Sequence, residues 1–153
     1  FTALSALPAR AMRQTHLAGI YEMSSRNAAC SCGQLQATTS GDPVRISVCH
    51  CLACQRRTGS VFGMQARFPR AQVQIRGESR IYTRISDDGN AVDFHFCAQC
   101  GATVFYHGQE DDPHIAIPVG AFADPAFPPP AFSVYEERKH RWVTIPGDVE
   151  HHS

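Results

Sequence analysis

The chain has 153 residues, of which 43% are hydrophobic and 18% are charged, a composition typical of one globular domain rather than of a disordered segment. Its 14 lysines and arginines balance its 14 aspartates and glutamates, so there is no net positive charge to attract nucleic acid. No apolar run approaches the roughly 20 residues that a helix needs to cross a bilayer. We therefore predict a domain without nucleic acid or membrane partners.

The first 23 residues show no strand alternation and no sustained apolar core. We expect residues 1–23 to be a leader or extension that lies outside the fold. Residues 24–153 are then expected to form a single domain.

Short strands separated by turns follow in chain order from residue 33 onward. Apolar and polar residues alternate within each stretch, and glycine, proline, asparagine or aspartate closes it. The predicted strands cover residues 35–39, 44–48, 60–68, 73–75, 81–85, 92–96, 103–106, 114–119 and 132–135. The 10 prolines and 11 glycines argue against a helical bundle, so the expected fold class is mainly β with little helix. We place Trp142 in the core and expect a disordered end at His151 and His152.

Seven cysteines lie in three tight groups along this strand pattern. The groups are Cys30-Ser31-Cys32, Cys49-His50-Cys51-Leu52-Ala53-Cys54 and Cys97-Ala98-Gln99-Cys100. Thiolates one or two residues apart can point at one ion, because a tight turn carries both side chains to the same side. An odd number of cysteines leaves a disulfide framework incomplete, and no βαβ pattern supports a thioredoxin-like motif. The spacing therefore favours metal binding.

The seven cysteines divide into four and three. Two groups are followed by glycine, and their cysteines supply the four sulfurs of a closed, structural zinc site. These four are Cys30, Cys32, Cys97 and Cys100. A site with only three protein ligands keeps one position open, as catalytic zinc sites do. Its ligands are Cys49, Cys51 and Cys54, with the side chain of His50 expected to point away. The alternative is a closed second site whose fourth ligand is His95, His107, His114 or His140.

A zinc ion with three thiolates carries a net negative charge, which makes it a poor Lewis acid for generating hydroxide and argues against a hydrolase. An incoming thiol suits the open position, because a coordinating thiol is deprotonated outright whereas a free one has a pKa of about 8.5. Glutathione is the obvious cellular thiol, and its two carboxylates need cationic partners. Arg56 and Arg57 directly follow Cys54 and are the predicted partners. Alternatively, both are solvated or offset the charge of the zinc–thiolate group.

The order and spacing of these motifs resemble the glutathione-dependent formaldehyde-activating enzyme family, which includes the centromere protein V domain. The matching segments are Cys30-Ser31-Cys32-Gly33, Cys49-His50-Cys51-Leu52-Ala53-Cys54 with Arg57-Thr58-Gly59-Ser60, Cys97-Ala98-Gln99-Cys100-Gly101 and Tyr135-Glu136-Glu137-Arg138-Lys139-His140-Arg141-Trp142. The resemblance covers roughly residues 28–146 and implies a tent-like arrangement of short antiparallel sheets stapled by zinc. It implies two zinc ions, one structural on the four cysteines and one catalytic on the three. It also implies a carbon–sulfur lyase that joins formaldehyde and glutathione into S-hydroxymethylglutathione and reverses the reaction.

Three functions remain open from the sequence. The first is this lyase, in which a thiolate attacks the carbonyl carbon and His50, His95 or His140 is a candidate for moving the proton. The second is a carrier that binds glutathione or another thiol without catalysis, and the third is a zinc-stabilised protein-interaction module. Seven thiols indicate a reducing compartment, so the cytoplasm is the expected location.

Overall fold

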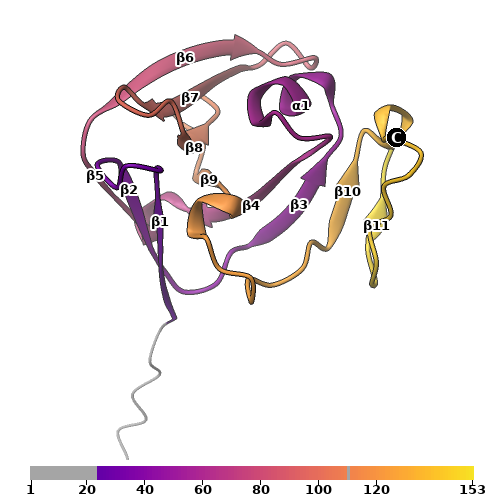
Figure 1. The fold of residues 1–153 in the computed structure, drawn as a ribbon, viewed down its shortest axis with the longest axis horizontal. Coiled ribbons are helices and arrows are strands. Elements are labelled where there is room, and N and C mark those ends of the chain that lie inside the picture. The colour runs from indigo at the N-terminus through magenta and orange to yellow at the C-terminus, as the bar shows by residue number, and fades with distance from the viewer. Residues whose placement is uncertain (1–23, 110) are drawn as a thin grey trace, which may run out of the picture.

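Eleven strands and one short α-helix make up the described part of the chain, which comprises residues 24–109 and 111–153 of a computed structural model (Figure 1). The predicted leader at residues 1–23 lies outside the described residues. The strands are β1 (Ser25–Ala29), β2 (Gln36–Ser40), β3 (Arg45–Cys49), β4 (Gly63–Pro69), β5 (Val73–Arg76), β6 (Ser79–Ile85), β7 (Ala91–Cys97), β8 (Thr103–His107), β9 (His114–Pro118), β10 (Phe132–Val134) and β11 (Glu150–His151). The helices are α1 (Leu52–Thr58) and the 3-10 turns η1 (Arg70–Gln72), η2 (Val119–Phe122) and η3 (Glu136–Arg138). The mainly β fold class with little helix is confirmed. No helix among these residues is both long and apolar enough to cross a membrane.

The strands form two sheets. A three-stranded sheet has the order β1-β2-β5, and an eight-stranded sheet has the order β11-β10-β3-β4-β9-β8-β7-β6. Neighbouring strands run antiparallel, except that β10 runs parallel to both β3 and β11. In Figure 1 the small sheet lies to one side of the large sheet, with α1 near the strands β3 and β4. All nine predicted strands are present, because alternation with period two is a local property that the tertiary structure preserves.

The hydrophobic core draws on both sheets and on the segment that follows β9. Its largest fully buried apolar side chains are Phe68 of β4, Leu35 just before β2, and Ile117 of β9. Phe122 and Phe127 stack with ring centroids 4.8 Å apart and belong to the same cluster. Each buried side chain of this size stabilises the fold by about 1.5–3 kcal/mol relative to its exposed state. The core therefore holds the two sheets together and includes Cys30 and Cys97.

Four features differ from the sequence prediction. Strand β1 lacks the usual β-branched residues, and it forms because it pairs along its whole length with β2. Helix α1 was not predicted, since seven residues are too few to show a helical period. Trp142 is 73% exposed, so its placement in the core is wrong. The expected disordered end is also wrong, because the backbone N–H of His152 donates to the carbonyl of Ser133 at 2.8 Å beside β11.

Candidate functional site

Four cysteine sulfurs meet where the two sheets approach each other. Cys30 and Cys32 lie in the turn between β1 and β2, Cys97 ends β7, and Cys100 lies in the turn between β7 and β8. Each turn contains a glycine at positive φ. Gly33 in the first turn has a φ of +78°, and Gly101 in the second has a φ of +76°. The four ligand atoms lie within 4.8 Å of one another, as the sequence predicts. We call this group the four-cysteine cluster.

Backbone amides surround the sulfurs of the four-cysteine cluster. The N–H of Leu35 donates to Cys30 Sγ at 3.2 Å, and the N–H of Gln99 donates to Cys97 Sγ at 3.4 Å. A backbone hydrogen bond from Cys100 is the largest of the effects that lower the pKa of the Cys97 thiol to about 6. Thiolate is the species that binds metal, so these hydrogen bonds favour the metal-binding form of Cys97.

The separation of the sulfurs fits zinc. Zn–S bonds of about 2.3 Å in a tetrahedron place the sulfurs about 3.8 Å apart. Cys32 Sγ lies 3.5 Å from Cys30 Sγ and 3.6 Å from Cys97 Sγ. These distances are far above the S–S bond of a disulfide, about 2.05 Å, and all seven cysteines are free. The donor set and its spacing are therefore compatible with a tetrahedral zinc ion.

Gly77→Ala should destabilise the domain by about 2–4 kcal/mol. A Cβ at residue 77 would lie 1.9 Å from the carbonyl oxygen of Gln34, at a φ of +90°. Gln34 also donates from its side-chain amide to Cys97 Sγ at 3.3 Å, so the displacement would reach the four-cysteine cluster. Gly89→Ala is the matched control, because its φ is +82° but no atom lies within 4 Å of the added Cβ. Urea unfolding of both variants tests this, and an equal loss would contradict it.

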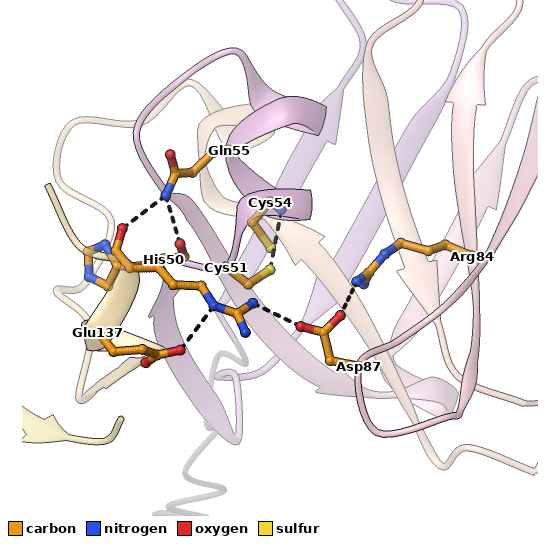
Figure 2. Close-up of polar contacts among 8 residues, drawn as sticks. His50, Cys51, Cys54, Gln55, Arg84, Asp87 and Glu137 are labelled. Carbon is orange, nitrogen blue, oxygen red and sulfur yellow. Dashed lines mark hydrogen bonds and ion pairs between the residues drawn. The ribbon is translucent and has the colours of Figure 1, made fainter.

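Three further sulfurs form a second group, the three-cysteine cluster. Cys49 ends β3, Cys51 is the residue before α1, and Cys54 lies in the first turn of that helix. Their Sγ atoms lie within 4.8 Å of one another, and no fourth His, Cys, Asp or Glu joins them among residues 24–109 and 111–153. The N–H of Cys54 donates to Cys51 Sγ at 3.3 Å, as Figure 2 shows. Gly63 opposes Cys49 on β4, and a Cβ there would lie 3.2 Å from Cys54 Cβ.

The three thiols of this cluster differ in acidity. Hydrogen bonds from the thiols of Cys49 and Cys54 lower the pKa of the Cys51 thiol to about 2. The hydrogen bond to Cys51 raises the pKa of the Cys49 thiol well above its usual range. The hydrogen bond with Cys49 lowers the pKa of the Cys54 thiol. The hydrogen bond with Cys51 and burial raise it, and the pKa is raised overall. Cys51 is therefore the most acidic of the three thiols.

A cavity of about 500 Å³, the sulfur pocket, opens beside the three-cysteine cluster and is lined by its three cysteines. This volume falls in the range of about 300–1,000 Å³ that small-molecule sites occupy. Tyr106 and His107 of β8 and Tyr135 after β10 also line it. Burial raises the pKa of the Tyr106 phenol, so this hydroxyl stays protonated at neutral pH. The sequence motifs did not connect Tyr106 with the three cysteines, because β3, β8 and the residue after β10 come together only in the tertiary structure.

Arg56 and Arg57 lie outside the sulfur pocket. They line a neighbouring cavity of about 590 Å³, which Cys54 borders as well. Arg56 is exposed, whereas the guanidinium of Arg57 lies 5.3 Å from the ring centroid of Phe94 and 5.1 Å from that of Tyr106. Two buried nitrogens of Arg57, Nε and Nη2, have no hydrogen-bond partner within the described part of the protein. The positive charge of Arg57 opposes the rise in the pKa of Cys54.

The histidines occupy several environments. His50 is fully buried and its Nε2 lies 3.2 Å from Ser133 Oγ, so its side chain points away from the sulfurs as expected. Nε2 of His140 contacts Gln55 Oε1 at 3.1 Å. In Figure 2, His50 and Gln55 lie on one side of the two labelled cysteines, and Asp87 and Arg84 lie on the other.

His95 and His107 form a pair with their Nε2 atoms 3.2 Å apart. His107 lines the sulfur pocket and so does His114, but His50, His95 and His140 do not. The three histidines considered from sequence for proton transfer therefore do not line this pocket.

Comparisons with known proteins identify one family. The model of the glutathione-dependent formaldehyde-activating enzyme family matches residues 25–138, from the start of β1 to the end of η3. A search of the curated proteins gave no significant match. A solved protein from Rhodobacter sphaeroides is similar, with 17% sequence identity and a TM-score of 0.49, over 62% of this chain and 85% of that chain. By the extent of the family match, the chain belongs to the glutathione-dependent formaldehyde-activating enzyme family.

Proposed function

We propose that the protein is a carbon–sulfur lyase that joins glutathione and formaldehyde into S-hydroxymethylglutathione at the three-cysteine cluster, and catalyses the reverse reaction. The observation that carries this proposal is a set of three convergent sulfurs open to a pocket large enough for a small thiol. Membership of the family supports the substrates. The seven free thiols support a reducing compartment, and the cytoplasm remains our expectation.

Zinc is the proposed cofactor of both clusters. Cys30, Cys32, Cys97 and Cys100 would hold a structural ion, and Cys49, Cys51 and Cys54 would hold a second ion. When bound to three protein sulfurs, zinc supplies a position where a substrate thiol is held in its deprotonated form.

The residues of the pocket would then position the two substrates. In the synthetic direction the substrate sulfur forms a bond to the carbonyl carbon, the π electrons move to the oxygen, and that oxygen takes up a proton. The protonated phenol of Tyr106 lines the pocket and is our candidate for donating a hydrogen bond to this oxygen. Confinement of both partners lowers the entropic part of the barrier. Arg56, exposed on the cavity that Cys54 borders, remains the predicted partner of a substrate carboxylate, with Arg57 as a nearby positive charge.

The alternative of a protein-interaction module has one observation in its favour. β6 is the edge strand of the large sheet, and Ile81, Tyr82 and Ile85 on it are 57%, 61% and 62% exposed. Exposed apolar side chains on an edge strand are typical of contact surfaces. A thiol carrier would use the same pocket as the lyase and differ only in lacking turnover.

Cobalt substitution tests the proposal directly. We expect glutathione to change the visible d–d and thiolate charge-transfer bands of one of the two cobalt sites, because only the three-cysteine cluster has room for another ligand. NMR exchange measurements of formaldehyde and glutathione should then show interconversion with the adduct above the uncatalysed rate. A spectral change without faster exchange would support the carrier. If glutathione changes the bands of neither cobalt site, both the lyase and the carrier proposals are wrong.

A further inference from the structure

Charged side chains of both signs gather at one side of the sulfur pocket. Arg84 on β6 and Asp87 in the turn between β6 and β7 both line the pocket. Arg84 Nη2 lies 2.7 Å from Asp87 Oδ1, and Arg138 Nη1 of η3 lies 2.9 Å from Asp87 Oδ2. Asp87 thus lies between two guanidinium groups, with its contact to Arg84 drawn in Figure 2. We call Arg84, Asp87 and Arg138 the charged triad.

The triad is held in place from the side of α1. The side-chain amide of Gln55 donates to the carbonyl oxygen of Arg138 at 3.2 Å, and Arg138 Nε lies 3.0 Å from Glu137 Oε1. The guanidinium of Arg138 also lies 5.3 Å from the ring centroid of Tyr135. Tyr135 has a φ of +58°, which is uncommon for a residue other than glycine. These contacts hold Arg138 in position to pair with Asp87.

The overall charge of the pocket restricts what the triad can bind. Four aspartates line the pocket, against two arginines. Asp87 is neutralised by its arginines, and Asp112 accepts hydrogen bonds from the N–H groups of Gly108 and His114. Asp88 is exposed at the pocket and is in none of the ion pairs among the described residues. A purely anionic group would be repelled here, but a group with both charges would not.

An adjacent ammonium and carboxylate match this arrangement. A carboxylate placed on Arg84 takes over the contact that Asp87 makes, and an ammonium then compensates Asp87 and Asp88. The ion pair between Arg84 and Asp87 is thus replaced by ion pairs with the ligand, and neither side chain is left without a partner. This favours binding because a charge without a partner costs free energy wherever solvent is displaced.

We propose that the charged triad, with Asp88, binds the α-amino-acid end of the substrate thiol, its carboxylate on Arg84 and its ammonium on Asp87 and Asp88. This inference rests on the proposed function and names the group by which that site selects its thiol. In a γ-glutamyl thiol the α-carbon of the glutamyl group lies roughly 9 Å from the sulfur when extended, a span that a pocket of this size accommodates. The site therefore selects thiols such as glutathione and γ-glutamylcysteine over N-acylated analogues and over cysteinylglycine.

Calorimetry with S-methylglutathione on the zinc-loaded full chain tests the triad, because a thioether keeps the amino-acid end but has no thiol to ionise. We expect it to bind at least about tenfold more tightly than its N-acetyl derivative, which has lost the ammonium. Asp87→Asn should bring this ratio close to one, and Arg84→Gln should weaken both ligands about tenfold. Arg80→Gln is the matched control, because Arg80 is exposed on the same strand and does not line the pocket. It should leave both affinities unchanged.

The ratio of the two affinities separates recognition from a general loss of structure. A ratio near one in the unaltered protein, or a ratio that Asp87→Asn leaves intact, would overturn the proposal. Absence of measurable S-methylglutathione binding would overturn it as well. If the affinity ratio is about tenfold and falls in Asp87→Asn, but thiols change neither the cobalt spectra nor the exchange rate, the triad proposal is supported and the lyase function is wrong. If glutathione turns over but the ratio is one, the lyase stands and the triad is wrong.

Discussion

Cys97→Ser should lower the melting temperature by more than about 10 °C or prevent folding altogether. Cys97 is fully buried at the end of β7, and its sulfur lies 3.6 Å from Cys32 Sγ in the turn between β1 and β2 of the small sheet. A structural zinc ion contributes about 10–16 kcal/mol of apparent binding free energy, and the whole stability of a domain is about 5–15 kcal/mol. Circular dichroism melting, together with the metal content per chain, measures the effect.

A chelator provides an independent route to the same result, because it removes the ion without changing a side chain. Added in excess, it should unfold the unaltered protein, and readdition of zinc should restore the β-sheet spectrum. Unchanged melting of Cys97→Ser with its full metal content would show that the four-cysteine cluster has no structural ion.

Cys51→Ser should bring the exchange of formaldehyde and glutathione down to the uncatalysed rate and cost little stability. Loss of a residue that only supports a metal ligand already costs about 10–100-fold, and loss of a ligand removes more. Cys51 is one of only three sulfurs in this cluster, so serine in its place leaves two sulfurs to hold an ion. The main hydrophobic cluster does not include Cys51, so the melting temperature should fall far less than for Cys97→Ser. NMR exchange and metal content on the same samples test both parts.

A conservative variant provides a control for this comparison of the two clusters. Ser31→Ala changes a residue between two ligands of the four-cysteine cluster without removing a sulfur, and it should leave metal content and exchange rate intact. If Cys51→Ser melts as low as Cys97→Ser, the three-cysteine cluster is structural and the interaction module becomes the better account. If Cys51→Ser still accelerates exchange, the chemistry occurs elsewhere.

The local features of this protein are determined by the sequence itself. Period-two alternation placed nine strands, and close spacing within each cysteine motif grouped the sulfurs, because both depend only on residues near one another in the chain. Even the division of seven cysteines into four and three followed from which turns end in glycine, and the structure brings the sulfurs together in those two sets. The orientation of His50 away from the sulfurs was predictable for the same local reason.

Only the tertiary structure decided which other side chains reach the sulfurs. Arg57 follows Cys54 closely in sequence, but aromatic rings of β7 and β8 hold its guanidinium outside the sulfur pocket. Asp87 and Arg138 are 51 residues apart and meet because the β6–β7 turn and η3 approach from opposite sides. Strand β1 exists through its pairing with β2, which its own composition does not indicate. Contacts of this kind depend on how the sheets pack, so a pattern along the chain carries no signal for them.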